Sequence, residues 1–408
     1  MMANEADVGP SLMQKQIKHI VILMMENRSF DNVLTWLYNE KEPPSHFIPT
    51  DAEPHFLGLY ESTLNQYTNS LKNSNGQVVY SCAPIKGIPS VSSTKFLNSP
   101  KFDPNEPFPN VTTQIFGNEG NSEPTMSGFL QDYASLWDEE DWLDQKETIC
   151  AVMETYTDKE FPLLYGLARH YAISDLWFSS VPSQTNPNRA FSICGTSDGE
   201  IVNGFLGKSL FQSDTLWNRL TEKSPQTTWS IFWQSDMLPV LFPGPFNGTN
   251  SFASLNRIPN LQDHFQTIDY FHELARKGQL PDISLLEPQW TLSLNFSPKE
   301  EEVVNFIFKN QELIAGLQGN DLHPPGDIRT AENLLANIYT SLSSNKEAWS
   351  ETLLIVTFDE HGGLFDHVPP PAAIPPDNKF QNGFKFDRYG SDYFYIPSYR
   401  EGNYYSFK

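Results

Sequence analysis

The stretch Leu353-Leu-Ile-Val-Thr-Phe-Asp-Glu-His-Gly-Gly-Leu-Phe-Asp-His-Val368 decides the fold of this chain. Its first six residues are mostly apolar, which predicts a strand buried on both faces. Asp359, Glu360 and His361 follow directly. In open α/β sheets the reactive groups lie in the crevice beyond the carboxyl ends of parallel strands. Two acids and an imidazole are costly to hold there unless something binds them, so we expect a metal ion with a phosphate against it.

A second apolar run, Ile17-Lys-His-Ile-Val-Ile-Leu-Met-Met25, ends in the same way, in Glu26-Asn-Arg-Ser-Phe-Asp31. Either run alone also fits a buried strand followed by a polar turn of no function. If the two runs lie side by side in one sheet, Glu26 and Asn27 converge with the acids after Phe358. The pair of runs therefore favours a functional site over two unrelated turns.

The composition fits one large α/β domain over residues 1–408, with 39% apolar and 13% aromatic side chains. An excess of 50 acidic over 27 basic residues gives a net charge of −23. This charge argues against a nucleic-acid partner and against electrostatic binding to an anionic membrane. The many aromatic residues leave binding to lipid or another apolar ligand open.

The cysteines and the first residues of the chain give indications of the protein's cellular compartment. Cys82, Cys150 and Cys194 are sparse and odd in number, which favours a reducing compartment or incidental thiols and leaves one disulfide open. The first residues lack the basic and apolar regions of a signal peptide, which predicts a cytoplasmic protein or export by an unconventional route. No apolar run approaches the roughly 20 residues of a transmembrane helix.

Helical and strand patterns alternate along the chain. This order predicts a mainly parallel sheet with helices on both faces, a three-layer α/β/α sandwich. Pro43 to Pro109 lacks clean periodicity, and we interpret it as a long irregular excursion over the sheet edge. The expected helices are Glu123–Tyr133, Phe161–His170 and Thr330–Leu342, and the further expected strands are Tyr171–Phe178, Thr228–Trp233 and Ile283–Leu286, the last followed by Glu287.

Thr185 lies in Val181-Pro-Ser-Gln-Thr-Asn-Pro-Asn-Arg189, between an expected strand and an expected helix. Pro187 suits the first turn of a helix. Thr185 or Asn186 would then cap that helix by accepting hydrogen bonds from its free amides. Thr185 at a helix amino terminus is also well placed to be a nucleophile, because amides and the helix dipole attract a phosphate there. The two roles are compatible.

Three histidines are candidates for a ligand or a general acid. His323 lies in Gly319-Asn-Asp-Leu-His-Pro-Pro-Gly-Asp327, where prolines and acids flank it, and this favours a ligand or general acid over an ordinary surface residue. His264 carries a weaker signal, since it fits a helix cap equally well. His19 falls within the first strand and fits a core position with a satisfied hydrogen bond.

Five motifs occur in a fixed order and span residues 17 to 390: Glu26-Asn-Arg-Ser-Phe-Asp31, Asp103-Pro with Val111-Thr-Thr-Gln-Ile-Phe116, Pro182-Ser-Gln-Thr-Asn-Pro-Asn-Arg189, Asn320-Asp-Leu-His-Pro-Pro-Gly-Asp327, and Phe358-Asp-Glu-His-Gly-Gly363 with Asp366-His-Val368. This set resembles the phosphoesterases that include non-specific phospholipase C and a group of acid phosphatases. The resemblance implies an alkaline-phosphatase-like fold, with metal at the carboxyl ends of the strands.

The resemblance also implies roles for individual residues. Glu26, Asn27, Asp359 and Glu360 fall on metal ligands, and Thr185 falls on the nucleophile that the metal activates and that the metal also binds. An oxygen-only set of ligands suits Ca²⁺ or Mg²⁺.

Histidines affect both the metal and the chemistry. His323 falls on a histidine that contacts phosphate, and we choose it as general acid for the leaving oxygen. His264 aligns loosely with a second such histidine. Adding His361 or His323 to the ligands would suit Zn²⁺ better than Ca²⁺.

Two departures from the family pattern stand out. Many relatives have Asp-Pro-Gly-His where this chain has Asp103-Pro-Asn-Glu106. A carboxylate at Glu106 would repel phosphate unless it bound a cation, which points to an additional or different metal. The second departure is residues 391–408, where the family's terminal strand is not recognisable.

The leading interpretation is a metal-dependent phospholipase C acting at a membrane or micelle surface. It would hydrolyse a glycerophospholipid such as phosphatidylcholine to diacylglycerol and a phosphorylated head group. Thr185 fits the phospholipase-like members, because the acid phosphatases have serine there. The aromatic-rich excursion, taken as residues 43–116, would supply apolar walls for acyl chains. An acid phosphatase with the same site and a catalytically impaired phospholipid-binding homologue are the alternatives.

Overall fold

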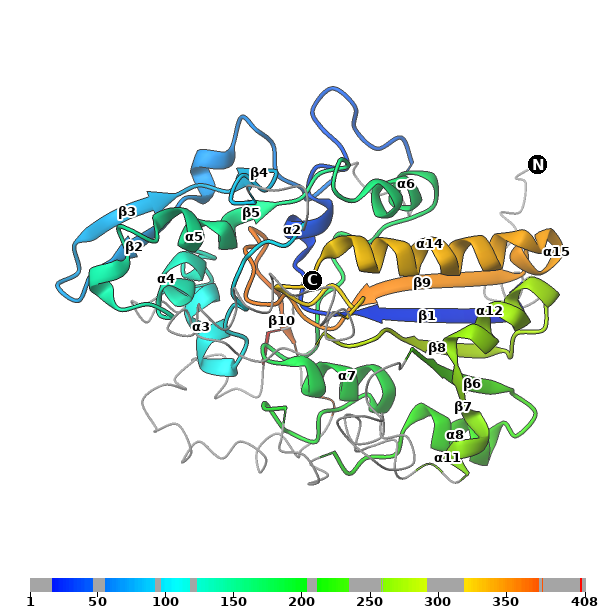
Figure 1. Ribbon diagram of the computed structural model, residues 1–408. Coiled ribbons are helices and arrows are strands. Elements are labelled where there is room, and N and C mark those ends of the chain that lie inside the picture. Colours follow the sequence, from blue (N-terminus) through cyan, green and yellow to red (C-terminus); the bar gives the residue numbers. More distant parts are fainter. Residues whose placement is uncertain are drawn as a thin grey trace, which may run out of the picture.

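A computed structural model describes residues 17–46, 56–91, 97–117, 123–203, 211–234, 258, 260–291, 319–373, 376 and 404–405. At its centre lies a five-stranded sheet in the order β7-β6-β8-β1-β9 (Figure 1). Every neighbouring pair in this sheet is parallel. The strands are β1 (His19–Met25), β6 (Trp229–Trp233), β7 (Phe265–Thr267), β8 (Ile283–Glu287) and β9 (Thr352–Phe358).

The two apolar runs singled out in the sequence are neighbours. β1 pairs with β9 along their full lengths, from His19 opposite Thr352 to Met25 opposite Phe358. The ladder continues one residue further, because the Asp359 amide donates to the Met25 carbonyl at 3.1 Å. The prediction that these runs lie side by side is confirmed, and the acids that follow them leave the sheet at the same edge.

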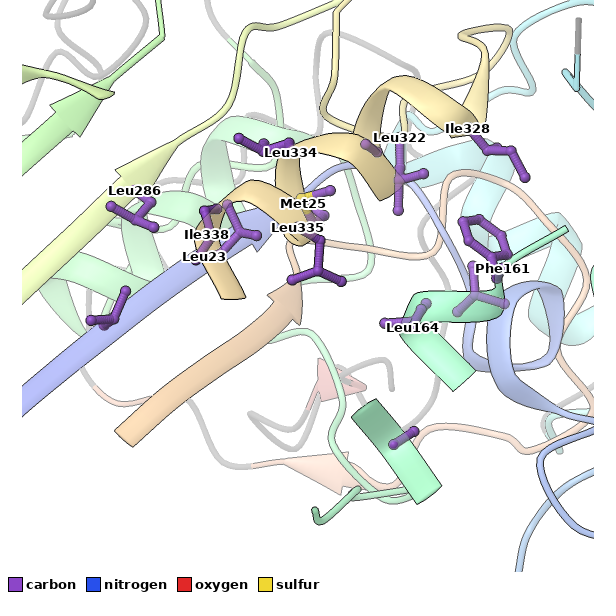
Figure 2. Packing of buried hydrophobic residues seen from close by; sticks show 14 of the residues in the cluster. Leu23, Met25, Phe161, Leu164, Leu286, Leu322, Ile328, Leu334, Leu335 and Ile338 are labelled. Carbon is purple, nitrogen blue, oxygen red and sulfur yellow. The ribbon is translucent and has the colours of Figure 1, made fainter. Parts of the chain in front are cut away.

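One face of the sheet is covered by α6 (Pro162–His170), α12 (Ile268–Lys277) and α14 (Ile328–Ser344). Apolar residues recur along α14 at three- and four-residue spacing, so one stripe of the helix faces the sheet. Figure 2 shows Leu334, Leu335 and Ile338 of this stripe beside Leu23 of β1 and Leu286 of β8.

The opposite face is covered by α7 (Thr185–Cys194), α8 (Leu216–Lys223) and α11 (Leu261–His264). Ile193 and Trp217 pack there against Trp229, Ile231 and Leu285. Helices therefore lie on both faces of a parallel sheet (Figure 1). This confirms the predicted three-layer α/β/α architecture.

A further group of elements lies beyond the carboxyl ends of the strands (Figure 1). Its core is formed around Val111, Phe129, Tyr133 and Ile149. The group contains β2 (Asn69–Lys72), β3 (Val78–Cys82), α3 (Phe108–Phe116), α4 (Phe129–Ala134) and α5 (Lys146–Cys150). β2 and β3 form an antiparallel hairpin, so the excursion after Pro43 is more regular than predicted.

A disulfide joins Cys82 at the end of β3 to Cys150 at the end of α5, and Cys194 lies outside it. The sparse cysteines had favoured reduced thiols, and the structure corrects that expectation for this pair. The two residues are 68 positions apart, and packing of the hairpin against α4 and α5 brings them together.

The remaining elements are short. They are α2 (Phe30–Leu34), η1 (Leu64–Tyr67), β4 (Ile85–Lys86), η2 (Glu139–Asp141), η3 (Ala151–Met153), β5 (Glu154–Thr155), α15 (Lys346–Trp349), β10 (Ala372–Ala373) and β11 (Tyr404–Tyr405). The predicted divergent segment 391–408 lies outside the described residues except for β11, which pairs antiparallel with β10. Within the part of the chain that the structure describes, every helix is too short or too polar to cross a membrane.

Three local predictions were wrong. The segment 171–178 forms no strand; Asp175 instead accepts a hydrogen bond at 2.8 Å from the Leu57 amide and ties this connection to the excursion. The helix expected from Glu123 begins only at Phe129, because the backbone at Met126 is left-handed (φ 52°). β9 is half-buried rather than buried on both faces, since it is the edge strand of the described sheet.

Candidate active site

A pocket of about 310 Å³ opens beyond the ends of β1 and β8, where α7 begins. Its polar lining is mainly carboxyl and amide groups, with two threonines and a histidine. The lining includes Glu26, Asp103, Glu106, Thr185, Asp321 and His323. The site therefore lies at the edge of the sheet that the sequence indicated.

Thr185 is the first residue of α7 and is 6% exposed. Its hydroxyl donates to Glu26 Oε2 at 3.1 Å. The side chain of Asn188 fixes the approach to the helix by donating to the carbonyls of Val181, Ser183 and Gln184 at 3.0 to 3.1 Å. A threonine hydroxyl is thus held against a carboxylate that follows β1.

The helix-cap interpretation of Thr185 is wrong. Gln184 occupies the N-cap position, and no side chain caps the helix there. The Asn186 amide donates instead to Asn203 Oδ1 at 2.8 Å, and Pro187 has no amide hydrogen. The dipole of α7 can therefore attract an anionic substrate at this first turn, but the Asn186 amide already donates to Asn203.

Backbone amides orient the acids that follow β9. Asp359 Oδ1 accepts from the amides of Asn27 at 3.0 Å and Glu360 at 2.7 Å. Glu360 Oε2 accepts from the Gly362 amide at 2.7 Å. Gly362 has a φ of 67°, and a Cβ there would collide with the Asn27 carbonyl, so only glycine allows this close approach.

Several buried oxygens at this edge have no hydrogen-bond partner among the described residues. They are Asn27 Oδ1, Asp359 Oδ2 and Glu360 Oε1, on side chains that are at most 2% exposed. Leaving such groups unpaired is costly. Carboxylate and amide oxygens without donors are what a hard divalent cation requires, so these residues fit the metal that the resemblance implied.

Arg189 belongs to the same motif as Thr185, but its role was not predicted from the sequence. It lies one helical turn after Thr185 on α7, and this four-residue spacing is the sequence feature that places both side chains on one face of the helix. Its buried guanidinium forms ion pairs with Glu26 and, at 2.8 Å, with Glu287, the acid that ends β8. A third carboxylate, Asp359 Oδ2, lies 3.8 Å away. Arg189 thus ties three strand ends to the helix that carries Thr185.

Burial dominates the electrostatics of the acids. It raises the pKa of Asp359 and Glu360 well above the usual range, and neighbouring carboxylates raise them further. Burial also raises the pKa of Glu26, against the opposing effect of Arg189. Without a cation these groups take up protons, because several carboxylates cannot all ionise in so small a volume.

Glu106 joins the same cluster. Asn27 Nδ2 donates to Glu106 Oε1. Burial raises the pKa of Glu106 well above its usual range, and the charge of Glu360 adds to this. His323 Nε2 lies 3.6 Å from Glu106 Oε1 and 3.8 Å from Asp103 Oδ2. The structure therefore brings Glu106 and His323 to the pocket, as the sequence predicted.

The chain matches the model of the Phosphoesterase family over residues 17–403. It belongs to the phosphoesterase family. It is 28% identical over 394 residues to non-specific phospholipase C6 of Arabidopsis thaliana, covering 94% of this chain and 61% of that protein. Non-specific phospholipase C3 of the same plant is 27% identical, with 95% and 64% covered. Phospholipase C B of Mycobacterium tuberculosis is 24% identical, with 88% and 61% covered. The chain thus spans less than two thirds of the length of these relatives.

Two predicted histidines of this phosphoesterase are not among the residues that line the pocket. His264 stacks on Trp229 with ring centroids 3.7 Å apart, and its Nδ1 is 3.0 Å from the Trp229 carbonyl. Trp229 begins β6, so His264 lies at the opposite end of the sheet and the structure does not bring it to the pocket. His361 Nε2 pairs with Gln114 Oε1 at 2.7 Å, and burial lowers the His361 pKa to about 3. His361 is therefore neutral, and its Nδ1 lies 3.2 Å from Glu360 Oε2.

A second cluster of the phosphoesterase joins the segments that follow β1 and β9. His367 donates its backbone amide to Asp31 Oδ2 at 2.7 Å, and its Nδ1 lies 2.6 Å from the same oxygen. Asp366 Oδ2 accepts from the Asp31 amide at 3.3 Å. Ser29 Oγ donates to the Phe365 carbonyl at 2.6 Å. These bonds hold the loop after β1 against the loop after β9.

We expect the metal-free phosphoesterase to lose stability as the pH rises from about 5 to about 8. The buried acids have raised pKa values, to about 6 for Asp103, so the folded chain binds more protons than the unfolded chain. Their stabilising contribution is complete below the ordinary carboxyl pKa and is lost as the pH rises through the raised values. Melting temperatures of chelator-treated protein across this range test the expectation.

The matched control is the same series with divalent cation present. Bound cation offsets the repulsion between carboxylates, so the melting temperature should then depend less on pH. A metal-free protein whose melting temperature rises between pH 5 and pH 8 would contradict the assignment of these acids as protonated.

Proposed function

We propose that this chain is a metal-dependent phospholipase C that converts glycerophospholipids such as phosphatidylcholine to diacylglycerol and a phosphorylated head group. One observation carries the proposal. The hydroxyl of Thr185 lies 3.1 Å from Glu26 Oε2, in a pocket where neighbouring buried carboxylate oxygens have no partner in the described part of the chain. That arrangement suits an activated nucleophile beside a cation.

Glu26, Asn27, Asp359 and Glu360 would hold the cation, with Thr185 beside them. The cation would lower the pKa of the Thr185 hydroxyl and neutralise charge on the phosphoryl oxygens. Glu26 orients the hydroxyl by accepting its hydrogen, which leaves the oxygen lone pairs directed away from Glu26. Arg189 keeps Glu26 in place by its ion pair.

Thr185 Oγ1 would attack phosphorus in line as its proton passes to Glu26 Oε2, and the bond from phosphorus to the diacylglycerol oxygen would break. The product of this step is a phosphothreonine that carries the head group. Protonated His323 would give a proton to the departing oxygen, because its Nε2 faces the pocket. Water would then attack the phosphothreonine, with neutral His323 accepting a proton from it, and Glu26 would return the first proton to Thr185 Oγ1 as its bond to phosphorus breaks.

The charge of the pocket favours a diester over a monoester. Glu26, Asp103, Glu106 and Asp321 all contribute to its lining. A phosphomonoester carries up to two negative charges near neutral pH and a phosphodiester carries one. Repulsion by the pocket acids therefore disfavours the monoester more. The names of the relatives, phospholipases C, support the same choice.

The test compares phosphatidylcholine with phosphatidic acid of identical acyl chains in mixed micelles. Both substrates release diacylglycerol on cleavage at the glycerol side, so a single assay measures the diester and the monoester. We expect rapid diacylglycerol release from phosphatidylcholine, with phosphocholine as the other product, and slow release from phosphatidic acid. The protein with Thr185→Ala serves as the background control.

The opposite order would identify a phosphomonoesterase with the same machinery. Binding of phosphatidylcholine micelles without diacylglycerol release from any phospholipid tested would identify an impaired phospholipid-binding homologue. Either outcome contradicts the proposed substrate while leaving the fold and the family membership unchanged.

A further inference from the structure

We propose that Asp103, Glu106 and His323 bind a second divalent cation, beside the cation assigned to Glu26, Asn27, Asp359 and Glu360. In the described residues, one ligand atom from each of the three side chains lies within 4.8 Å of the other two. The side chains are 9 to 12% exposed, so they are mostly withdrawn from water. The set combines two carboxylates and one imidazole.

The separations between these ligand atoms suit an ion better than direct contacts. His323 Nε2 is 3.6 Å from Glu106 Oε1 and 3.8 Å from Asp103 Oδ2. Hydrogen bonds from nitrogen to oxygen are usually no longer than about 3.2 Å. Ligand atoms at about 2.1 Å from a tetrahedral ion lie about 3.4 Å from one another, which is close to the observed spacing.

The hydrogen bond on the other side of the imidazole points to the same conclusion. His323 Nδ1 is 2.6 Å from the Pro324 carbonyl oxygen, which can only accept. Nδ1 therefore carries the hydrogen, and in the neutral ring Nε2 presents a lone pair to Asp103 and Glu106. Three acceptors then face one another. A backbone carbonyl behind the imidazole is a common support for a metal-binding histidine.

Asn27, assigned above to the first cation, also contacts this second group. Its side chain is fully buried and its amide contacts Glu106, yet Asn27 Oδ1 has no hydrogen-bond partner within the described residues. Asp103 Oδ1 is also buried without a partner there. Asn27 and Glu106 thus connect the two groups of ligands.

The charge balance requires more than one divalent cation if the acids are ionised. Among the described residues, Arg28 and Arg189 are the buried arginines that neighbour seven largely buried carboxyl groups in and beside the pocket. These seven belong to Glu26, Asp103, Glu106, Glu287, Asp321, Asp359 and Glu360. One divalent cation leaves three excess negative charges to meet an anionic phosphate. A second cation leaves one, and the phosphate can then enter.

The mixed donor set favours Zn²⁺ over Ca²⁺ or Mg²⁺, because imidazole is a poor ligand for hard cations. In one respect the inference alters the proposed function. With an ion on Nε2, His323 cannot protonate the leaving oxygen, and the ion would neutralise that oxygen in place of the proton. The binding of the ion itself does not depend on which substrate is cleaved.

The test counts ions. Full-length protein is freed of metal with a chelator, dialysed against Zn²⁺ and analysed for zinc and protein. We expect two ions per chain in the wild type and one in Glu106→Gln and in Asp103→Asn. Glutamine at position 106 keeps the size of the side chain and can still accept from Asn27. Circular dichroism and thermal melting show whether each variant is folded, and either variant alone suffices to test the site.

The matched control is Asp366→Asn. Asp366 belongs to the other group of three, with Asp31 and His367, whose ligand atoms also lie within 4.8 Å of one another. Two ions should remain in this variant. The proposal is overturned by one ion or none in the wild type, by two ions in folded Glu106→Gln and Asp103→Asn, or by loss of an ion in Asp366→Asn alone. One ion in an active wild type leaves the proposed function standing, with His323 as proton donor.

Discussion

Replacing Thr185 by alanine is expected to lower the turnover of phosphatidylcholine by about three orders of magnitude or more, the usual scale for loss of a covalent nucleophile. The hydroxyl is the group that contacts Glu26 at the bottom of the pocket. Its removal leaves no oxygen to form the phosphothreonine. Diacylglycerol release under substrate saturation measures kcat directly.

Two further variants separate the oxygen from the shape of the side chain. Thr185→Ser keeps the hydroxyl and should retain part of the rate. Thr185→Val keeps the shape, removes the oxygen and should be as inactive as Thr185→Ala. Mass spectrometry of acid-quenched wild-type enzyme should find the phosphorylated head group on the peptide that contains Thr185. Wild-type turnover in Thr185→Ala would reject the mechanism.

The layered fold was predictable because parallel strands that helices cover on both faces have continuous apolar runs in their sequence. The runs that became β1, β6, β8 and β9 were all recognised, with their ends within two residues. The pairing of β1 with β9 was predictable only from their shared acidic endings. No local pattern specifies which strands in a parallel sheet are neighbours, since the connections between them are long.

Where a local sequence pattern predicted the wrong structure, tertiary contacts explain the structure that forms. Residues 171–178 have the composition of a strand, but Asp175 ties them to the excursion. The disulfide between Cys82 and Cys150 depends on a hairpin packing against two helices, which cysteine spacing cannot reveal. In both cases the deciding partner is far away in the sequence.

The carboxylates of the site were predicted from the sequence, but the positive charge of Arg189 that compensates them was not. Glu26 reaches the pocket as expected, because polar groups at strand ends have few alternatives, and Glu106 reaches it from the turn before α3. Arg189 was missed because its partners Glu26 and Glu287 come from two separate strands. His264 was misplaced because its neighbouring residues fit a site and a helix end equally well.

Removal of divalent cation is expected to abolish diacylglycerol release and to lower the melting temperature. Ligand binding to the folded state alone stabilises it by about 2.7 kcal/mol when the ion is at 100 times its Kd. The single substitution Asp359→Asn should likewise weaken cation binding and lower diacylglycerol release. Asparagine can still accept from the amides of Asn27 and Glu360, but it removes the charge and places an N–H where the unpartnered Oδ2 lies. We expect loss of about two or more orders of magnitude in turnover, together with one ion.

The control for this variant is Asp132→Asn. Asp132 is a buried carboxyl whose pKa burial raises to about 6, so its environment resembles that of Asp359. It differs in having donors for both oxygens, from Asn110 at 2.8 Å and Gln114 at 2.7 Å, and it takes no part in the proposed chemistry. Asp132→Asn should keep its ions, even where it costs stability. Full turnover in protein that elemental analysis shows to be metal-free would remove the cation from the mechanism. Thr185 would then have to be activated by Glu26 alone.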